Sequence, residues 1–302
     1  MKKVLSLFAM VWLTLSAYAA DPAHVRVLSI GNSFSLDAFS YVPFLMDELA
    51  PGTQVDFGIL YIGGCRLKRH DENLQGAKAD YDFYQYHAGA DKWVSRKGVS
   101  IQEGMAAEDW DIVILQQQSA DSRYYSTYQP YLDHLIDYIH TDKPKAKIAW
   151  LLTQAYGEGF GDLKGMVSDE MWARTDEASE RVMKETGVNI LIPAGTAIQN
   201  ARYTSLDRFG KFGHLVHDGY HLQEGVAAYI EGLVATRSLL AAYGVDVDVQ
   251  QSRIKVTHDW WKGKNTPQPH GEPEEATDEE WAIARQCAQW ALDTPWSLTI
   301  KE

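Results

Sequence analysis

The chain has 302 residues, of which 45% are hydrophobic and 23% are charged, and its formal net charge at pH 7 is −13. This length is enough for one large α/β domain with a sizeable core. The acidic balance argues against a protein that binds nucleic acid or an anionic membrane through its overall electrostatic field.

Residues 1–19 are organised like a signal peptide. A basic start at Lys2 and Lys3 precedes an apolar run over 4–15, and Ala17-Tyr18-Ala19 offers small residues for cleavage. The apolar run is too short to span a membrane comfortably, and no cysteine follows the cleavage site to carry a lipid anchor. We therefore expect a periplasmic or secreted protein with no integral membrane segment, in which 20–302 form a single domain.

A buried strand is predicted over 25–30, where most residues are apolar and several are β-branched. The strand stops at Gly31-Asn32-Ser33, and apolar residues then recur at helical spacing from Leu36 to Met46. A strand-to-helix turn here places the Ser33 hydroxyl at the rim of a sheet, beside the free N–H groups of a helix start. Ser33 is therefore either a nucleophile that shares its turn with part of an oxyanion hole, or only the N-cap of the helix.

A second strand over 53–62 ends at Gly63 and Gly64. Two glycines at a strand end allow the backbone to approach a ligand closely, although they also suit a plain turn. The basic residues of 66–70 follow directly. We interpret them either as a solvated loop or as a site for an anionic substrate group, such as a uronic acid.

The stretch of about 66–108 is predicted to be a lid-like insertion beside the site. Its central part is rich in rings, namely Tyr81, Phe83, Tyr84, Tyr86, His87 and Trp93. Such rings either stack on the faces of sugars or only fill the underside of a lid.

A third, fully buried strand over 111–115 runs straight into three glutamines and Ser119. Buried amides need hydrogen-bond partners, so a site or a polar network is expected at this strand end. If the strand continues, alternation puts Gln116 and Gln118 on one side and Gln117 on the other. Which of the three glutamines serves a site stays open.

Strands and helices then alternate. Helices are predicted over 130–140, 171–186 and 194–203, strands over 147–152 and 189–193, and a glycine-rich loop over 156–165. The helix over 194–203 carries Arg202 toward the predicted site. This alternation predicts an α/β fold, a three-layer α/β/α sandwich around a mostly parallel sheet, with function at the C-terminal ends of the strands.

The composition shifts after Gly244. We predict an extended segment over 245–256, a surface loop rich in proline and glycine over 262–276, and a last helix that Thr277 or Asp278 caps and that ends before Pro295. The stretch of about 250–302 is thus interpreted as a C-terminal helical extension that packs on the same domain.

A second polar motif lies before the helix predicted after residue 222. Asp218 stands three residues before His221. An aspartate at this spacing can accept a hydrogen bond from the imidazole Nδ1–H and leave Nε2 to take a proton from a serine hydroxyl. The alternative is a metal site that also uses His214 and His217, but Gly219 argues against a rigid helix that presents both histidines, and we expect no metal.

These blocks together resemble the SGNH (GDSL-like) hydrolases. The resemblance spans roughly Val25 to Leu240 and rests on GNSFS after the first strand, the glycine pair, an amide after a buried strand and DGYH near the end. It is nearest to a branch of secreted bacterial proteins, many of them from gut bacteria that degrade polysaccharides. The chain departs from the family in its third block, which usually supplies asparagine and here offers only glutamines.

The resemblance implies roles for individual residues. Ser33 is the expected nucleophile, His221 the base and Asp218 the group that orients it. The expected oxyanion hole consists of the N–H groups of Ser33 and Gly64, with Gly63 as the alternative, and the amide of Gln116. Further substrate-binding candidates are Asn32, Gln118, Arg66 and Arg202.

The expected function is that of an exported serine esterase that removes acyl groups, by default acetyl, from a small-molecule or polysaccharide ester without a cofactor. Two alternatives stay open. One is a non-catalytic glycan-binding protein on the same fold, whose surface would be the aromatic stretch 81–93, and the other is an esterase for lipids or phospholipids. Cys65 and Cys287 either form a disulfide or stay as free thiols.

Overall fold

The computed structural model of the chain describes residues 24–267 and 270–300. The predicted signal peptide, 1–19, lies outside these residues. Within the described part, no helix is long and apolar enough to cross a membrane.

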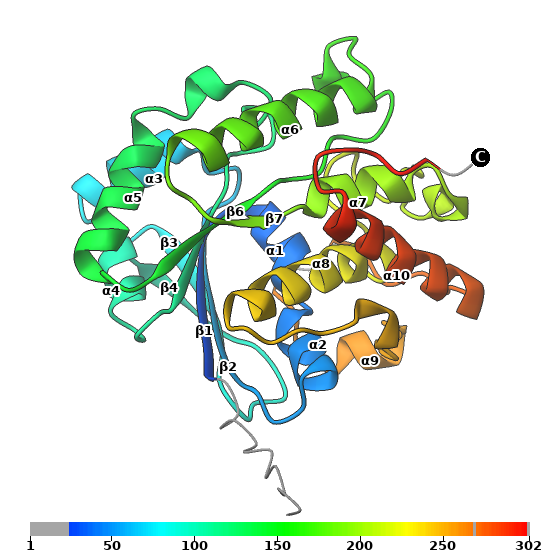
Figure 1. Cartoon of the computed structure of the whole chain (residues 1–302), viewed down its shortest axis with the longest axis horizontal. Helices are drawn as coiled ribbons and strands as arrows, with labels where there is room; N and C mark the ends of the chain where they lie inside the picture. The colour runs from blue at the N-terminus through cyan, green and yellow to red at the C-terminus, as the bar shows by residue number, and fades with distance from the viewer. Residues whose placement is uncertain (1–23, 268–269, 301–302) are drawn as a thin grey trace, which may run out of the picture.

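A seven-stranded sheet forms the centre of the molecule (Figure 1). Its spatial order is β4 (Val94–Val99), β3 (Tyr81–Tyr86), β2 (Gln54–Tyr61), β1 (His24–Gly31), β5 (Ile112–Leu115), β6 (Lys147–Leu151) and β7 (Ile190–Ile192). The five strands from β2 to β7 run parallel, and β3 and β4 are antiparallel additions beside β2. The predicted α/β fold with a mostly parallel central sheet is confirmed.

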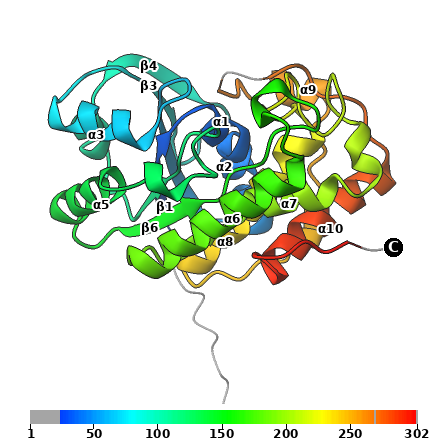
Figure 2. The same ribbon diagram turned by 90° about the horizontal axis from the view of Figure 1, so that it is seen from above.

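Helices cover both faces of this sheet (Figures 1 and 2). One face carries α1 (Ser33–Phe39), α2 (Val42–Leu49), α7 (Ala194–Ala201), α8 (Val226–Ala242) and α10 (Asp278–Asp293). The other face carries α3 (Leu67–Gln75), α4 (Ile101–Met105), α5 (Tyr131–Asp142) and α6 (Ser168–Glu185). Side chains alternate along β5, because Ile112 and Ile114 join the first layer while Val113 and Leu115 join the second.

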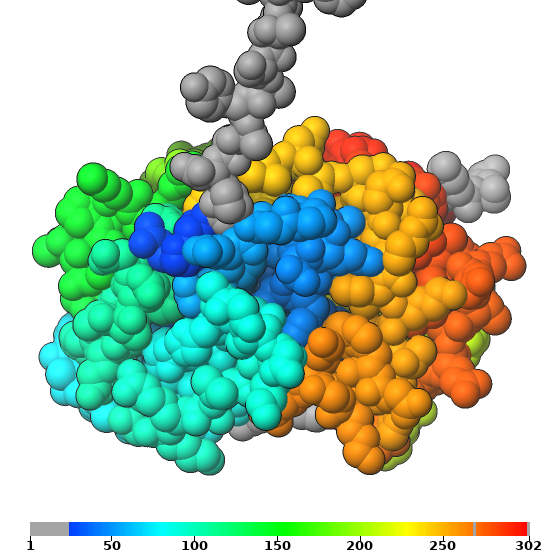
Figure 3. Space-filling model, turned by 90° about the horizontal axis from the view of Figure 1, so that it is seen from below, coloured from blue at the N-terminus to red at the C-terminus, as the bar shows by residue number. Residues whose placement is uncertain are grey.

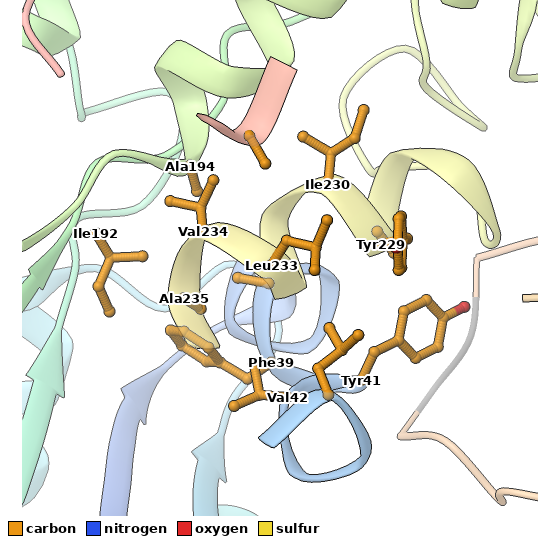
Figure 4. Close-up of a cluster of buried hydrophobic side chains, with 14 of the residues drawn as sticks. Phe39, Tyr41, Val42, Ile192, Ala194, Tyr229, Ile230, Leu233, Val234 and Ala235 are labelled. Carbon is orange, nitrogen blue, oxygen red and sulfur yellow. The ribbon is translucent and has the colours of Figure 1, made fainter. Parts of the chain in front are cut away.

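The helix predicted from Leu36 to Met46 is two helices. Pro43 lies in the first turn of α2, where its missing N–H costs nothing, and it cannot continue α1. Figure 4 shows Phe39 and Val42 from this segment pointing toward Leu233 of α8. Every residue of α8 from Val226 to Thr236 is buried. This packing fixes the start of the helix and therefore the position of the turn at 218–221 that precedes it.

The stretch of about 66–108 is not a lid over the site. It contains α3, β3, β4 and α4, and its two strands extend the sheet beyond β2. The reason lies in the alternation along β3, whose rings enter the core on both faces of the sheet. Tyr81 and Phe83 pack in one layer, while Tyr84 and Tyr86 pack in the other.

The C-terminal stretch packs against the helices of the first layer. Seen from below, its gold and orange residues lie beside the blue α1–α2 region (Figure 3). The Glu48 carboxylate accepts a hydrogen bond from the N–H of Ile254 at 2.9 Å. The short helix α9 (His258–Lys262) places Trp260 against Phe44. Thr277 caps α10 through a reciprocal capping box with Glu280. The predicted extended segment 245–256 contains only a short 3₁₀ turn at Val249–Gln251.

Candidate active site

Strand register brings three separate polar loops to one edge of the sheet. Ile30 of β1 lies beside Leu60 of β2 and Leu115 of β5. The three strands are parallel, so the residues that follow them emerge together at their C-terminal ends. The Ser33 turn, the glycine pair and the glutamine run therefore meet, as predicted.

Ser33 is the first residue of α1, and its neighbour Asn32 is the N-cap. The Asn32 side chain accepts a hydrogen bond from the N–H of Phe34 at 3.0 Å, so the capping role falls to Asn32 and not to Ser33. A side chain at Gly31 would meet the Ser35 hydroxyl at 2.1 Å, which explains why glycine precedes this tight turn. The N–H of Ser33 belongs to the first turn of a helix and has no acceptor within that helix.

The DGYH turn comes within hydrogen-bond distance of Ser33. The Nε2 atom of His221 lies 2.7 Å from the Ser33 Oγ atom, and its Nδ1 atom lies 2.8 Å from Asp218 Oδ2. The backbone N–H groups of His221 and Tyr220 both donate to the other Asp218 oxygen, at 3.0 and 3.3 Å. This arrangement orients the imidazole and leaves its Nε2 atom to face the hydroxyl.

The environment shifts the pKa values of the acid and the base. Partial burial works to raise the pKa of Asp218, but its hydrogen bonds from His221 and Tyr220 outweigh burial and hold that pKa below its usual value. Burial lowers the pKa of His221, and the Asp218 carboxylate only partly opposes this. At neutral pH the pair is therefore an ionised carboxylate beside a neutral imidazole, which is the form that can accept a proton.

A cavity of about 470 Å³ opens over Ser33 and His221. Ser33, Gly63 and Gly64 lie on its wall together with His221. Gly64 has a φ of +59°, a conformation that favours glycine, and the space beside it is open. The Asn32 amide donates to the Cys65 carbonyl oxygen at 3.0 Å and so ties the serine turn to the glycine turn.

The structure does not place Gln116 in the cavity. Its side chain is buried, donates to Asn32 Oδ1 at 2.6 Å and accepts from the Ser35 hydroxyl at 2.8 Å. Gln117 points elsewhere, because it donates to the Thr127 carbonyl oxygen at 3.1 Å. Gln118 is the glutamine that lines the cavity. Strand β5 ends at Leu115, so alternation could not assign these three side chains.

The two arginines predicted to bind substrate lie in different places. Arg66 lines the cavity and forms an ion pair with Asp121 at 2.7 Å. Arg202 is half-buried, does not line the cavity, and donates to the carbonyl oxygens of Ala155 and Tyr156 at 2.9 and 3.2 Å. Burial lowers the pKa of its guanidinium to about 10. The role that these contacts indicate is to hold the loop that carries Tyr156, and not to bind substrate.

The remaining alternatives concern cysteines and metals. Cys65 and Cys287 are free thiols buried in different hydrophobic clusters, and burial raises the pKa of each to about 12. His214 pairs with Asp207 at 3.0 Å, and His217 lies 3.2 Å from the Gln223 amide oxygen. Across residues 24–267 and 270–300, the structure has no group of three side chains suited to hold a metal ion.

The cavity also contains residues that sequence reasoning missed. They share no sequence motif and include Ser119, Tyr156, Asp162, Tyr220 and His270. Tyr220 and Ser119 are neighbours of predicted residues and could have been found through them. His270 lies in the proline-rich loop, where no periodic pattern points to the site.

Comparison with solved structures gives two useful neighbours. A crystal structure of a DUF4886 family protein from Bacteroides uniformis is 25% identical, with a TM-score of 0.77, and the match covers 92% of this chain and 98% of that one. A protein from Slackia heliotrinireducens, described as a candidate SGNH hydrolase, is 23% identical with a TM-score of 0.50. That match covers 72% of this chain and 99% of the other. The second likeness concerns the fold alone.

Sequence comparisons identify the family. No curated protein matches the chain. The family model of DUF4886, described as a domain of unknown function, matches residues 26–255, which is well over half of the chain. The chain therefore belongs to the DUF4886 family.

Proposed function

We propose that this protein is an exported serine esterase that removes acyl groups, with acetyl as the default, from carbohydrate. The observation that carries the proposal is the chain of two hydrogen bonds, 2.7 Å and 2.8 Å long, that joins Ser33 through His221 to Asp218 at the cavity. A hydroxyl, an imidazole and a carboxylate in this order are the parts of a serine nucleophile with its base.

In the first half of the reaction, the Ser33 oxygen attacks the ester carbonyl carbon and its proton passes to His221 Nε2. The tetrahedral intermediate collapses, the bond to the leaving alkoxide breaks, and His221 returns the proton to that alkoxide. Asp218 stabilises the imidazolium between these two transfers. The acyl group is then on Ser33.

In the second half, water attacks the acyl-serine while His221 takes one of its protons. The carboxylic acid leaves, and the same proton restores the Ser33 hydroxyl. In both halves the oxyanion needs donors, and we assign the N–H groups of Ser33 and Gly64 and the amide of Gln118 to this role.

Three features of the cavity wall support a sugar ester. Tyr220 is half-buried and offers aromatic surface on which a sugar ring can pack, and the buried Tyr156 ring packs beside it. Ser119 and Gln118 offer hydroxyl and amide groups for sugar hydroxyls. Among the described residues, Arg66 is the one arginine on this wall. It is paired with Asp121, and Asp162 adds a carboxylate, so we expect a neutral sugar and not a uronic acid.

A glycan-binding protein without catalysis is the competing function. The aromatic surface that it needs, 81–93, is mostly in the core, with Tyr81, Phe83 and Trp93 at most 1% exposed. The test is incubation with a chromogenic acetyl ester and a serine-directed fluorophosphonate, followed by a search for acetate released from acetylated plant and host glycans. Turnover with labelling of Ser33 supports the esterase, and glycan affinity without either supports the binder.

The glutamines give the first prediction. Gln118→Ala is expected to lower kcat by about 10²- to 10³-fold with a smaller effect on KM, because an oxyanion donor acts mainly in the transition state. Gln116→Ala is the control and is expected to lower the free energy of unfolding by about 1–3 kcal/mol through its lost bonds to Asn32 and Ser35. Measuring kcat, KM and Tm for both separates these effects. A large loss of kcat confined to Gln116→Ala would reassign the oxyanion amide to that residue.

The second prediction concerns pH. His221 must be neutral to accept the Ser33 proton, and burial lowers its pKa, so the neutral form persists to more acidic pH than for an exposed histidine. We expect the acidic limb of kcat/KM to have its midpoint below about 6.5, the ordinary imidazole value. A pH profile with an acetyl ester measures this midpoint. A midpoint above the pKa of free imidazole would show that the Asp218 carboxylate affects the pKa of His221 more than burial does.

A further inference from the structure

We infer that His270 is a positioning residue of this site, whose ring holds the imidazole of His221 in the plane that faces Ser33. The inference rests on the proposed esterase function. It adds to that function a residue that lies outside the matched family region, 26–255.

Three aromatic rings pack around the His221 ring. The His270 ring lies parallel to it, with 3.9 Å between the ring centroids and an angle of 4° between the planes. The Tyr220 ring lies 4.1 Å away between centroids, tilted by 41°, and the Phe34 ring lies 6.0 Å away in an edge-to-face arrangement. The two ring nitrogens are bound to Ser33 and Asp218. Rotation of the imidazole out of this plane would therefore meet a ring.

The backbone around His270 is fastened to the turn that carries His221. The N–H of Glu224 donates to the His270 carbonyl oxygen at 3.3 Å, and the Gln223 amide donates to the Glu272 carbonyl oxygen at 2.6 Å. Gly271 has a φ of +81°, and a side chain there would come within 2.6 Å of the Gln223 amide. Glycine at this position lets the loop lie close enough for the two histidines to stack.

Titratable groups face the stacked pair from two elements. From α1, Asp37 is buried, and its Oδ1 atom lies 3.7 Å from His270 Nε2, which has no hydrogen-bond partner among the described residues. The other Asp37 oxygen accepts a hydrogen bond from the N–H of Leu222 and so connects α1 to the turn that carries His221. From the turn itself, Asp218, His217 and Tyr220 face the pair.

The charge state of His270 suits this role. Burial, aided by the neighbouring histidine, lowers the pKa of His270 to about 4, so it stays neutral at ordinary pH. When His221 takes the Ser33 proton it becomes a cation, and a neutral ring on its face does not repel it, whereas a second imidazolium would. The stack thus orients the base without opposing its protonation.

The test compares His270→Ala with His270→Phe, which keeps a flat ring. We expect His270→Ala to lower kcat about 10-fold or more with little change in KM, because the base is less well oriented. It should also move the acidic limb of the kcat/KM profile toward higher pH. Water then reaches His221, so burial lowers the pKa of His221 less than in the wild type. His270→Phe should retain most of kcat and the wild-type limb. His258→Ala, a half-exposed histidine in the same C-terminal stretch, is the matched control.

An NMR titration of His221 in the free protein makes the test independent of turnover. The His221 pKa should rise in His270→Ala and stay at the wild-type value in His270→Phe. Equal loss of kcat in both variants, or an unchanged His221 titration in His270→Ala, overturns the inference. Absence of turnover and of fluorophosphonate labelling in the wild type would instead count against the esterase itself. Should His270→Ala fail to fold, His270→Asn removes the ring with less loss of volume and gives the same comparison.

Discussion

Ser33→Ala is expected to reduce kcat/KM for an ester substrate by about 10³-fold or more while the protein stays folded. The Ser33 oxygen is the atom that forms the acyl bond, and in the part of the chain that the structure describes it alone is hydrogen-bonded to His221 Nε2, at 2.7 Å. The side chain lies on a cavity wall, so its removal leaves no void in the core. Measurement of kcat/KM and Tm on the same preparations checks both parts.

Ser35→Ala is the matched control for this variant. Ser35 lies on the same short helix but is fully buried, with its hydroxyl bonded to Ser29 at 2.9 Å and to Gln116 at 2.8 Å. We expect it to lower the free energy of unfolding by about 1–3 kcal/mol and to change kcat far less than Ser33→Ala does. Turnover retained in Ser33→Ala, free of contaminating host esterase, would rule out the proposed mechanism.

The predictions that succeeded depend on neighbours in the chain. Apolar strands that alternate with amphipathic helices lead to a parallel sheet, and the fold class follows from that alternation. Asp218 and His221 belong to one turn, so the turn itself brings the two side chains together. Parallel strands share one edge for their C-terminal ends, which brings Ser33 near Gly64 without any knowledge of the side chains.

The predictions that failed concern side-chain direction. Gln116 and Gln118 follow the end of β5, where the pleat no longer dictates a side, and only the contacts with Asn32 and Ser35 turn Gln116 inward. Arg202 does lie at the end of α7, but its guanidinium turns to the carbonyl oxygens of the 155–156 loop. The direction of such a side chain depends on which hydrogen-bonding groups the tertiary structure places near it.

The aromatic stretch shows how composition alone misleads. Rings suited to stack on a sugar are equally suited to fill a core, and β3 uses them on both faces of the sheet. His270 is the opposite case, because a single histidine in a proline-rich loop carries no signal. Its place beside His221 depends on the backbone path through Gly271 and on two hydrogen bonds to distant residues.

His221→Ala is expected to lower kcat about as far as Ser33→Ala, on the order of 10³-fold or more. Among the described residues, His221 is the one hydrogen-bond partner of the Ser33 hydroxyl, so its removal takes away the acceptor of the Ser33 proton and the group that returns it to the leaving alkoxide. The Asp218 carboxylate cannot take over, because its Oδ1 atom accepts from two backbone N–H groups of the same turn and its Oδ2 atom is bonded to His221 Nδ1, the ring nitrogen that does not face Ser33. Steady-state kinetics on the single variant measure this loss.

The double variant tests whether Ser33 and His221 act as one unit. If they do, Ser33→Ala with His221→Ala is little worse than either single change, because the second substitution removes a partner that has already lost its function. Losses that multiply would mean that the two residues act independently. His217→Ala is the control, since its Nδ1 atom faces Gln223 and not the nucleophile, and it should be mild. A severe loss in His217→Ala with near-normal kcat in His221→Ala would mean that the base had been assigned to the wrong histidine.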